Sequence, residues 1–322
     1  MTDEDAPGLW WGTAAAATQC EGAAPRSDWA GWEAEGRVPA SADGNGFRTR
    51  YADDLGLLAE HGITHHRLTV EWARLEPHPG RWDADEVAHL HRVLAAARVA
   101  GVAVWACLLH GSAPGWFTDD QRGWLDDKAV LTWARHVDRV AEAIGDQVAG
   151  WVPIHEPEAL ARLGYGDGAF PPGRHTDEDE HDARAALLAA EAEAARLLRT
   201  GAAPVAVALH DDPRREHGDL VVVSAPVDRL EQELEQAAER TGDNGVLVVT
   251  ADPGGGAGRV DRLEAAVRTV AGAHHGGVPI VGAFHQPAVD GYEWHRGFDA
   301  RLGLFERDRD PAPALSALPL AR

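Results

Sequence analysis

Eight apolar segments alternate with amphipathic segments along this chain of 322 residues. Several of the apolar segments are continuous runs rich in β-branched residues, as in Val205–Leu209, Leu220–Val223 and Val246–Val249. Such runs are typical of strands that are buried on both faces of a parallel sheet. Because each parallel connection needs a crossover, usually a helix, the alternation predicts an α/β fold of the (β/α)8 TIM-barrel type. We expect residues 1–322 to form this barrel as a single domain.

The element boundaries follow from the hydrophobic periodicity and from glycine stops after several helices. The predicted strands are Leu9–Ala15, Ile63–Val70, Val102–Leu108, Val148–Ile154, Val205–Leu209, Leu220–Val223, Val246–Val249 and Ile280–Phe284. The predicted helices are Phe47–Glu60, Ala84–Val99, Asp127–Ile144, Glu178–Leu198, Val227–Arg240 and Arg259–Ala273.

One connection is too short for a complete crossover helix. Only the nine residues Asp211–Asp219 separate His210 from Leu220, whereas a parallel crossover takes about a dozen residues or more. We therefore expect a vestigial or missing helix after strand five. A doubly wound open sheet is the alternative fold, but no G-x-G-x-x-G motif follows the first strand.

The composition excludes several classes of function and partner. The formal net charge of −22 disfavours nucleic acid and anionic membranes as partners. No apolar run is long enough to span a bilayer, and the acidic N-terminus lacks a signal-peptide pattern, so we expect a cytoplasmic protein. Cys20 and Cys107 have neither disulfide-framework nor metal-site spacing, and the single lysine, Lys128, falls in a helical pattern that disfavours Schiff-base chemistry. We expect no cofactor, and the sequence leaves the oligomeric state open.

The segment Trp151–Glu158 places a carboxylate where a barrel performs its chemistry. Four apolar residues run into His155, Glu156 and Pro157, and Pro157 ends the strand because it has no N–H for the ladder. Glu156 then projects from the rim, partly desolvated and with a raised pKa, as a general acid requires. The alternative is a structural carboxylate that caps a helix or forms an ion pair.

Polar and titratable residues follow the other predicted strands as well. In a TIM barrel, the C-terminal ends of the strands carry the active site. The residues at these ends are Gln19, Arg67 with Glu71, His110, His155, His210, Ser224, Asp252, His285 and Gln286. Such a ring of amides, carboxylates and imidazoles indicates that a polar small molecule binds at this end of the barrel.

Motifs along nearly the whole chain resemble, in the same order, the family 1 glycoside hydrolases, the β-glucosidase family. They are Trp11–Gly22, Arg50–Leu55, His65–Pro77, Gly123–Leu125, Trp151–Pro157, Gly164–Gly173, Gly282–Phe284, Asp290–Trp294 and Arg301–Leu304. The resemblance implies a small-molecule β-glycoside or sugar as the ligand. It also implies that Glu156 is the acid/base and that Arg67 is the arginine that orients the nucleophile.

The same resemblance assigns the sugar ligands. It implies that Gln19, His110 and Glu293 contact the sugar hydroxyls and that the indole of Trp294 contacts the sugar. His155 stands where the family has the asparagine that bonds the 2-hydroxyl, and Gln286 stands where it has a tryptophan. We count both among the substrate-binding residues.

The most consequential departure from the family lies at the end of strand seven. The family's Thr-Glu-Asn-Gly motif corresponds here to Thr250-Ala251-Asp252-Pro253, so the position of the nucleophile holds Ala251. A retaining glycosidase needs two carboxyl groups roughly 5–5.5 Å apart, and an inverting one roughly 6.5–9.5 Å apart. Asp252 and Glu71 are the candidates for the second carboxylate beside Glu156.

Four functions remain open on the sequence alone. The first is a glycosidase with an altered nucleophile step, and the second is a non-catalytic, sugar-binding pseudoenzyme. The third is metal-assisted chemistry by His110, His155, His210 and His285, although no H-x-H spacing supports it. The fourth is a phosphate cradle in the glycine-rich segment 252–259, of the kind barrels form after strand seven.

Overall fold

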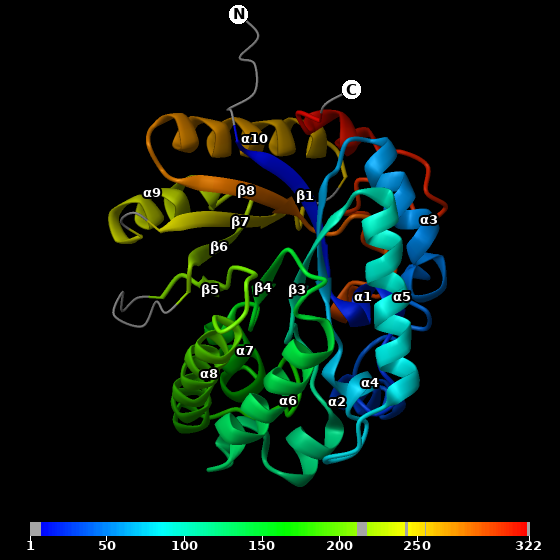
Figure 1. Cartoon of the computed structure of the whole chain (residues 1–322), viewed down its shortest axis with the longest axis vertical. Coiled ribbons are helices and arrows are strands. Elements are labelled where there is room, and N and C mark those ends of the chain that lie inside the picture. Colours follow the sequence, from blue (N-terminus) through cyan, green and yellow to red (C-terminus); the bar gives the residue numbers. More distant parts are fainter. Residues whose placement is uncertain (1–7, 211–217, 242–243, 255, 321–322) are drawn as a thin grey trace, which may run out of the picture.

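The computed structural model describes residues 8–210, 218–241, 244–254 and 256–320. Its centre is one sheet of eight parallel strands, around which the helices lie (Figure 1). The strands are β1 (Trp10–Ala15), β2 (His65–Thr69), β3 (Ala103–Cys107), β4 (Gly150–Val152), β5 (Ala206–Ala208), β6 (Leu220–Pro226), β7 (Gly245–Ala251) and β8 (Ile280–His285). The predicted TIM barrel is therefore confirmed, and the extent of the domain over residues 1–322 stays a prediction.

The barrel closes through a narrow seam between β4 and β5. The hydrogen-bonded strand order is β4-β3-β2-β1-β8-β7-β6-β5. Its two ends meet at a single parallel bridge between Trp151 and Val205, where the Trp151 N–H donates to the carbonyl of Pro204 at 2.9 Å. Because β4 and β5 have three residues each, this is the least extensively bonded seam of a nearly closed barrel.

The long helices lie close to the predicted ranges. The helices are α1 (Ala17–Glu21), α2 (Asp28–Ala34), α3 (Phe47–Glu60), α4 (Trp72–Leu75), α5 (Ala84–Ala100), α6 (Ala129–Ile144), α7 (Pro157–Ala161), α8 (Asp177–Leu198), α9 (Leu230–Arg240) and α10 (Arg259–His275). The prediction of a vestigial or missing helix after strand five falls mainly on residues 211–217, which lie outside the described residues. The described residues beside them, 209–210 and 218–219, are not helical.

Alternate residues of each strand face two different cores. In β7, Leu247 and Val249 pack in the barrel interior with Trp105 and Phe284, whereas Val246 and Val248 pack in the layer between sheet and helices. This alternation decides which side chains beyond the strand ends reach the mouth of the barrel.

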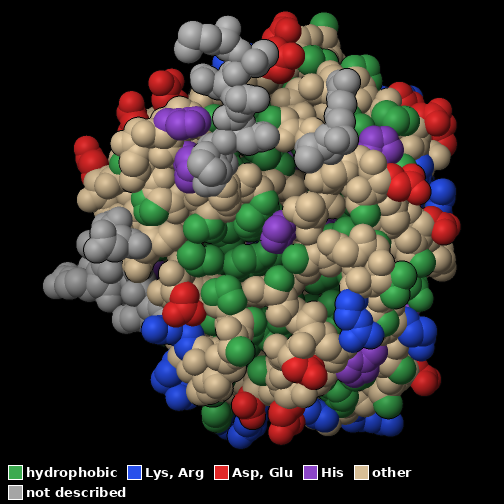
Figure 2. Space-filling model, turned by 45° about the horizontal axis from the view of Figure 1, so that its top comes forward, with side chains coloured by type: hydrophobic (Ala, Val, Ile, Leu, Met, Phe, Trp, Pro, Cys, Tyr) green, Lys and Arg blue, Asp and Glu red, His purple; other side chains and the backbone are tan. Residues whose placement is uncertain are grey.

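One face of the molecule has an apolar centre and a charged edge (Figure 2). On the face drawn in Figure 2, hydrophobic side chains gather near the centre, while acidic and basic side chains lie mostly toward the edge. Across residues 8–210, 218–241, 244–254 and 256–320, none of the helices is both long and apolar enough to cross a membrane.

We predict that Phe284→Ala destabilises the fold by about 3–5 kcal/mol, the usual cost of removing a buried phenylalanine ring. Phe284 is fully buried, and its ring contacts Trp10 at a centroid distance of 4.9 Å. Equilibrium denaturation in urea measures the change. The control is Val99→Ala at a side chain that is 88% exposed, which should change stability by no more than about 0.5 kcal/mol. Equal effects of the two substitutions would contradict the assignment of the interior core.

Candidate functional site

A cleft of about 450 Å³ opens at the C-terminal ends of the strands. It brings together seven of the residues predicted for the site, from five separate parts of the chain. These lining residues are Gln19, His110, His155, Glu156, Gln286, Glu293 and Trp294. The volume suits a small molecule of the size of a sugar.

Glu156 lies on the wall of this cleft at the point where β4 passes into α7. Its backbone is in the left-handed region, with φ 49° and ψ 62°, and Pro157 begins the helix directly after it. Non-glycine residues in this conformation are uncommon and concentrate at functional sites. The side chain remains 45% exposed, yet the surrounding protein desolvates the carboxyl enough to raise its pKa, against the opposing charge of Arg67.

Arg67 lies beneath the cleft and is fully buried. Its guanidinium donates to Nδ1 of His155 at 2.9 Å, to Oε1 of Gln286 at 2.8 Å and, at the longer distance of 3.5 Å, to Nδ1 of His110. Burial, followed by the charge of Arg67, lowers the pKa of His110 well below its usual value. Burial and the neighbours His110 and Arg67 do the same for His155. All three partners of Arg67 are therefore neutral.

These bonds determine the tautomers of both histidines. A neutral imidazole that accepts at Nδ1 carries its proton at Nε2. His155 thus directs an N–H toward Glu156, with 3.7 Å between Nε2 and Oε1. The two rings lie 4.0 Å apart, so His110 and His155 form a pair of donors on the floor of the cleft.

A second chain of hydrogen bonds orients side chains that the family resemblance assigns to sugar binding. Gln286 donates from Nε2 to Oε1 of Gln19 at 3.1 Å, and Gln19 donates from Nε2 to Oε2 of Glu293 at 2.8 Å. Burial raises the pKa of Glu293 to about 7, although Arg296 and Gln19 oppose the shift. Beside them, Trp294 packs edge-on against Trp29 with 4.7 Å between ring centroids. An amide, a carboxylate and an indole in one cleft are groups that suit a polyhydroxylated ring.

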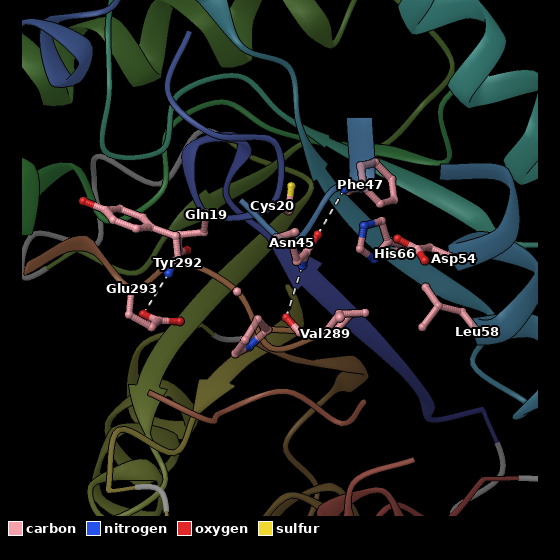
Figure 3. A pocket seen from close by; sticks show the side chains of 14 residues that line it. Gln19, Cys20, Asn45, Phe47, Asp54, Leu58, His66, Val289, Tyr292 and Glu293 are labelled. Carbon is pink, nitrogen blue, oxygen red and sulfur yellow. Dashed lines mark hydrogen bonds between the residues drawn. The ribbon is translucent and has the colours of Figure 1, made fainter. Parts of the chain in front are cut away.

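Behind Gln19 and Glu293 lies a second, much smaller cavity (Figure 3). Its volume is about 20 Å³, which is enough for a water molecule and too little for a sugar. Asn45 and Phe47 form its wall on the side away from the cleft, and Asn45 donates to the carbonyl of Val289 at 3.2 Å. Gln19 and Glu293 line both this cavity and the cleft, and they therefore lie between the two.

Asp252 does not lie on the cleft, which corrects its prediction as a second catalytic carboxylate. Leu247 and Val249 face the barrel interior, so Ala251 shares their face and Asp252 lies on the opposite one. The Asp252 carboxylate is buried and bonds to Arg262 of α10, with 2.9 Å between Oδ2 and the guanidinium nitrogen. Its direction, toward the helix layer, results from the strand pleat.

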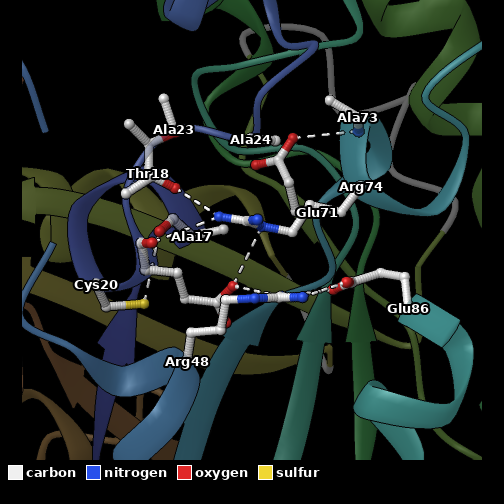
Figure 4. Close-up of polar contacts among 12 residues, drawn as sticks. Ala17, Thr18, Cys20, Ala23, Ala24, Arg48, Glu71, Ala73, Arg74 and Glu86 are labelled. Atoms are coloured by element: carbon white, nitrogen blue, oxygen red, sulfur yellow. Dashed lines mark hydrogen bonds and ion pairs between the residues drawn. The ribbon is translucent and has the colours of Figure 1, made fainter. Parts of the chain in front are cut away.

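Glu71 is also directed away from the cleft, so the other candidate for the second carboxylate is not supported. Its side chain accepts from the Ala73 N–H at 3.3 Å and from Ser112 Oγ at 3.0 Å. It lies in a buried polar cluster with Arg74 near the start of α4 (Figure 4). Burial raises its pKa, and its bonds fit a structural role as the cap of α4.

Two of the four strand-end histidines lie against the helix layer and not in the cleft. His210 bonds through Nε2 to Glu191 of α8 at 2.6 Å, and His285 lies 3.2 Å from Arg259 of α10. The predicted four-histidine cluster is therefore not assembled. Over the residues with described positions, no group of three or more His, Cys, Asp or Glu side chains is placed to hold a metal ion.

The predicted phosphate cradle after strand seven is partly occupied by the protein itself. Oδ1 of Asp252 accepts from the Gly254 N–H at 3.1 Å, so a carboxylate takes the place that an anion would need. Gly255, within the same segment, lies outside the described residues. The structure gives no support to this reading.

Sequence reasoning missed several side chains of the cleft, among them Arg296 and Phe170. Arg296 lies on the loop after Trp294, lines the cleft and donates to the carbonyl of Pro253 at 3.1 Å. Phe170 also lines the cleft and packs on Trp294 with ring centroids 5.0 Å apart. Neither residue stands at a strand end, so the strand-end rule could not find them.

Comparisons with known proteins agree with this geometry. Residues 6–241 match the profile of the family described as "Glycosyl hydrolase family 1". The chain is similar to Beta-glucosidase 1B of Phanerodontia chrysosporium, with 32% identity over 181 residues, covering 52% of this chain and 33% of that protein. It is similar to Beta-glucosidase 38 of rice (Oryza sativa subsp. japonica), with 33% identity over 128 residues, covering 39% of this chain and 26% of that protein. The matched stretches thus span between a quarter and a third of these relatives.

Solved structures share the fold over a larger part of the chain. The β-glucosidase of Thermotoga maritima in complex with glucoimidazole has a TM-score of 0.85 at 17% identity, covering 96% of both chains. The β-glycosidase of Pyrococcus horikoshii has a TM-score of 0.86 at 19% identity, covering 96% of this chain and 92% of that one. At these identities the likeness establishes the barrel fold.

We predict that Glu293→Gln flattens the pH dependence of stability between pH 5 and 8. The folded-state pKa of Glu293 is about 7, above the ordinary value for an unfolded chain, so the folded state holds the proton more tightly. The native protein therefore loses stability relative to the variant as pH rises through this range. Thermal unfolding midpoints at several pH values measure the effect. Glu264→Gln, at a surface carboxylate, should keep the native slope, and a native slope in Glu293→Gln would refute the assignment.

Proposed function

The chain belongs to glycosyl hydrolase family 1, and from this premise we propose that it acts on β-glycosides with Glu156 as general acid/base and with an impaired nucleophile step. The observation that carries the proposal is the position of Glu156. Its carboxyl lies in the same cleft as the Gln19–Glu293 pair and Trp294, and burial raises its pKa. A carboxyl with a raised pKa beside a set of sugar ligands suits the role of proton donor to a departing glycosidic oxygen.

The proposed substrate class follows from the side chains that line the cleft and from the similar proteins. Amide, carboxylate and imidazole groups lie in the cleft with the half-buried indole of Trp294, a set that suits the hydroxyls and the apolar faces of one sugar ring. The curated relatives are named β-glucosidases, and a structure of similar fold holds glucoimidazole. A β-glucoside-like small molecule is therefore the first substrate to test.

The impaired step follows from the end of β7. The position at which the family has its nucleophile holds Ala251, whose methyl group cannot attack an anomeric carbon. Asp252 is turned to α10 and paired with Arg262, so it cannot take over without breaking that pair. The Arg67 guanidinium, which the resemblance assigns to the nucleophile, instead bonds to Gln286 and His155. Retention through a covalent intermediate is not expected from this arrangement.

We predict that Glu156→Gln lowers any glycosidase turnover by about 10²–10⁴-fold, the scale of general acid–base catalysis. The amide keeps the shape of the side chain and removes the proton that the leaving oxygen needs. Initial rates on a panel of aryl β-glycosides measure the loss. The matched control is Glu158→Gln, two residues further along, whose side chain pairs with Arg184. Unchanged turnover in Glu156→Gln would refute the role of Glu156.

We predict that azide or formate accelerates the cleavage of activated aryl β-glycosides and gives an inverted product. These anions are small enough to enter the space beside the Ala251 methyl and to attack in place of the absent carboxylate. Without them, kcat should lie below the ordinary enzyme range of roughly 1–10³ s⁻¹. Ala251→Glu should restore a small retaining activity and abolish the anion effect. An ordinary kcat with retained configuration in the native protein would contradict this account and would indicate another nucleophile.

A non-catalytic, sugar-binding role is the second candidate, and the placement of Ala251 and Asp252 favours it. The cleft keeps its sugar-type ligands while the strand-seven carboxylate is absent from its wall. A glucoimidazole soak that shows a bound inhibitor, together with no turnover in any anion, would support this role over the enzymatic one.

A further inference from the structure

We propose that the attacking group is inorganic phosphate and that the protein is an inverting glycoside phosphorylase. This inference rests on the proposed function and names its missing nucleophile. The phosphate lies beside Ala251, between Arg296 at the rim of the cleft and the floor formed by Gln286 over Arg67.

Two arginines lie around this part of the cleft without a carboxylate partner among the described residues. Arg67 is fully buried and donates to the neutral groups of His155, Gln286 and His110. Arg296 is exposed, and its guanidinium donates to the carbonyl of Pro253, two residues after the end of β7. The charge of Arg67 acts on Glu156 and that of Arg296 acts on Glu293, but no carboxylate bonds directly to either arginine among the described residues. An anion that approaches the floor therefore gains from the field of Arg67 and from direct bonds to Arg296.

None of the nearby carboxylates occupies the proposed phosphate position. Asp252 is turned outward and paired with Arg262. Glu293, on the same loop as Arg296, accepts from Gln19, and a pKa of about 7 reduces its negative charge near neutral pH. Glu156 belongs to the wall formed by β4 and α7, where its proton serves the leaving group.

Phosphate can attack without a catalytic base, whereas water needs one. An inverting hydrolase needs a second carboxylate, roughly 6.5–9.5 Å from the acid, to take a proton from the attacking water. Neither candidate for that base, Asp252 or Glu71, lies on the cleft wall. A phosphate dianion already carries a nucleophilic oxygen and needs no base, so a single carboxylic acid is sufficient for the reaction.

The step balances with the groups at hand. A lone pair of a phosphate oxygen forms a bond to the anomeric carbon on the face opposite the aglycone. The glycosidic carbon–oxygen bond breaks, and its electron pair stays on the leaving oxygen, which takes the proton of Glu156. The products are a glycosyl 1-phosphate of inverted configuration and a free alcohol. Glu156 regains its proton from solvent, and nothing is oxidised or reduced.

The test compares cleavage of an aryl β-glycoside panel with and without millimolar inorganic phosphate, at constant ionic strength, with sulfate as the anion control. We expect phosphate, and not sulfate, to raise the rate by about tenfold or more, the effect of at least one charge-assisted bond. Phosphorus NMR should identify a glycosyl 1-phosphate of inverted configuration. Arg296→Gln should raise the KM for phosphate by about 10–100-fold with a smaller effect on the KM for the glycoside.

The control variant is Arg301→Gln, at an arginine of the same loop that is 77% exposed and lines no part of the cleft; it should leave the KM for phosphate unchanged. Free sugar as the sole product, at a rate indifferent to phosphate, would overturn the inference. If azide or formate still promotes cleavage in that case, the proposed glycosidase function survives while the phosphorylase inference fails. If no anion promotes cleavage, both fail together.

Discussion

The site is organised around one buried cation, the guanidinium of Arg67. It is fully buried in the middle of β2, and its bonds reach residues that follow β3, β4 and β8, namely His110, His155 and Gln286. Because it can only donate, each imidazole must accept at Nδ1 and present its N–H to the cleft. Burial first, and then this charge, lower the pKa values of both histidines and keep them neutral. One residue thus determines the hydrogen-bonding character of the floor on which a ligand would lie.

The partners of Arg67 differ from those of two partly buried arginines elsewhere in the protein. Arg309 pairs with Asp54 at 2.7 Å, and Arg74 lies 3.4 Å from Glu21 in the cluster of Figure 4. These ion pairs connect α1, α3 and α4 away from the cleft and offset the cost of burying each charge. Arg67 has amide and imidazole partners instead. A protein that compensates its structural cations but leaves this one without a carboxylate has an anion-attracting field at the strand-seven side of its cleft.

At the end of β7, the carboxylate of this protein stands one residue later than the nucleophile of its family. The pleat directs Ala251 into the barrel and Asp252 outward, because Leu247 and Val249 belong to the interior core. The carboxylate nearest in sequence to the expected nucleophile therefore stabilises α10 through Arg262. Register in a strand that is buried on both faces is strongly fixed, since a slip would exchange both cores at once. The outward position of Asp252 is for this reason a stable feature of the fold.

The sequence by itself determined the barrel and the place of Glu156. Continuous β-branched runs in Val246–Val249 and its counterparts are typical of strands buried on both faces of a parallel sheet, and eight of them in alternation with helices favour the barrel over an open sheet. Pro157 cannot donate to a strand ladder and begins α7, so Glu156 stands directly before a helix, on the connection that follows β4. Local chemistry is sufficient for such features because they depend on the backbone and on burial alone.

Only the tertiary structure decided which strand-end residues meet. Sequence position groups His210 and His285 with His110, but Glu191 and Arg259 hold the first two in the helix layer. The partners of Arg67 lie 43, 88 and 219 positions away along the chain, and the rim position of Arg296 comes from a loop that no strand pattern marks. The direction of a side chain past the last hydrogen bond of a strand depends on pairings between distant segments, and these form when the barrel closes.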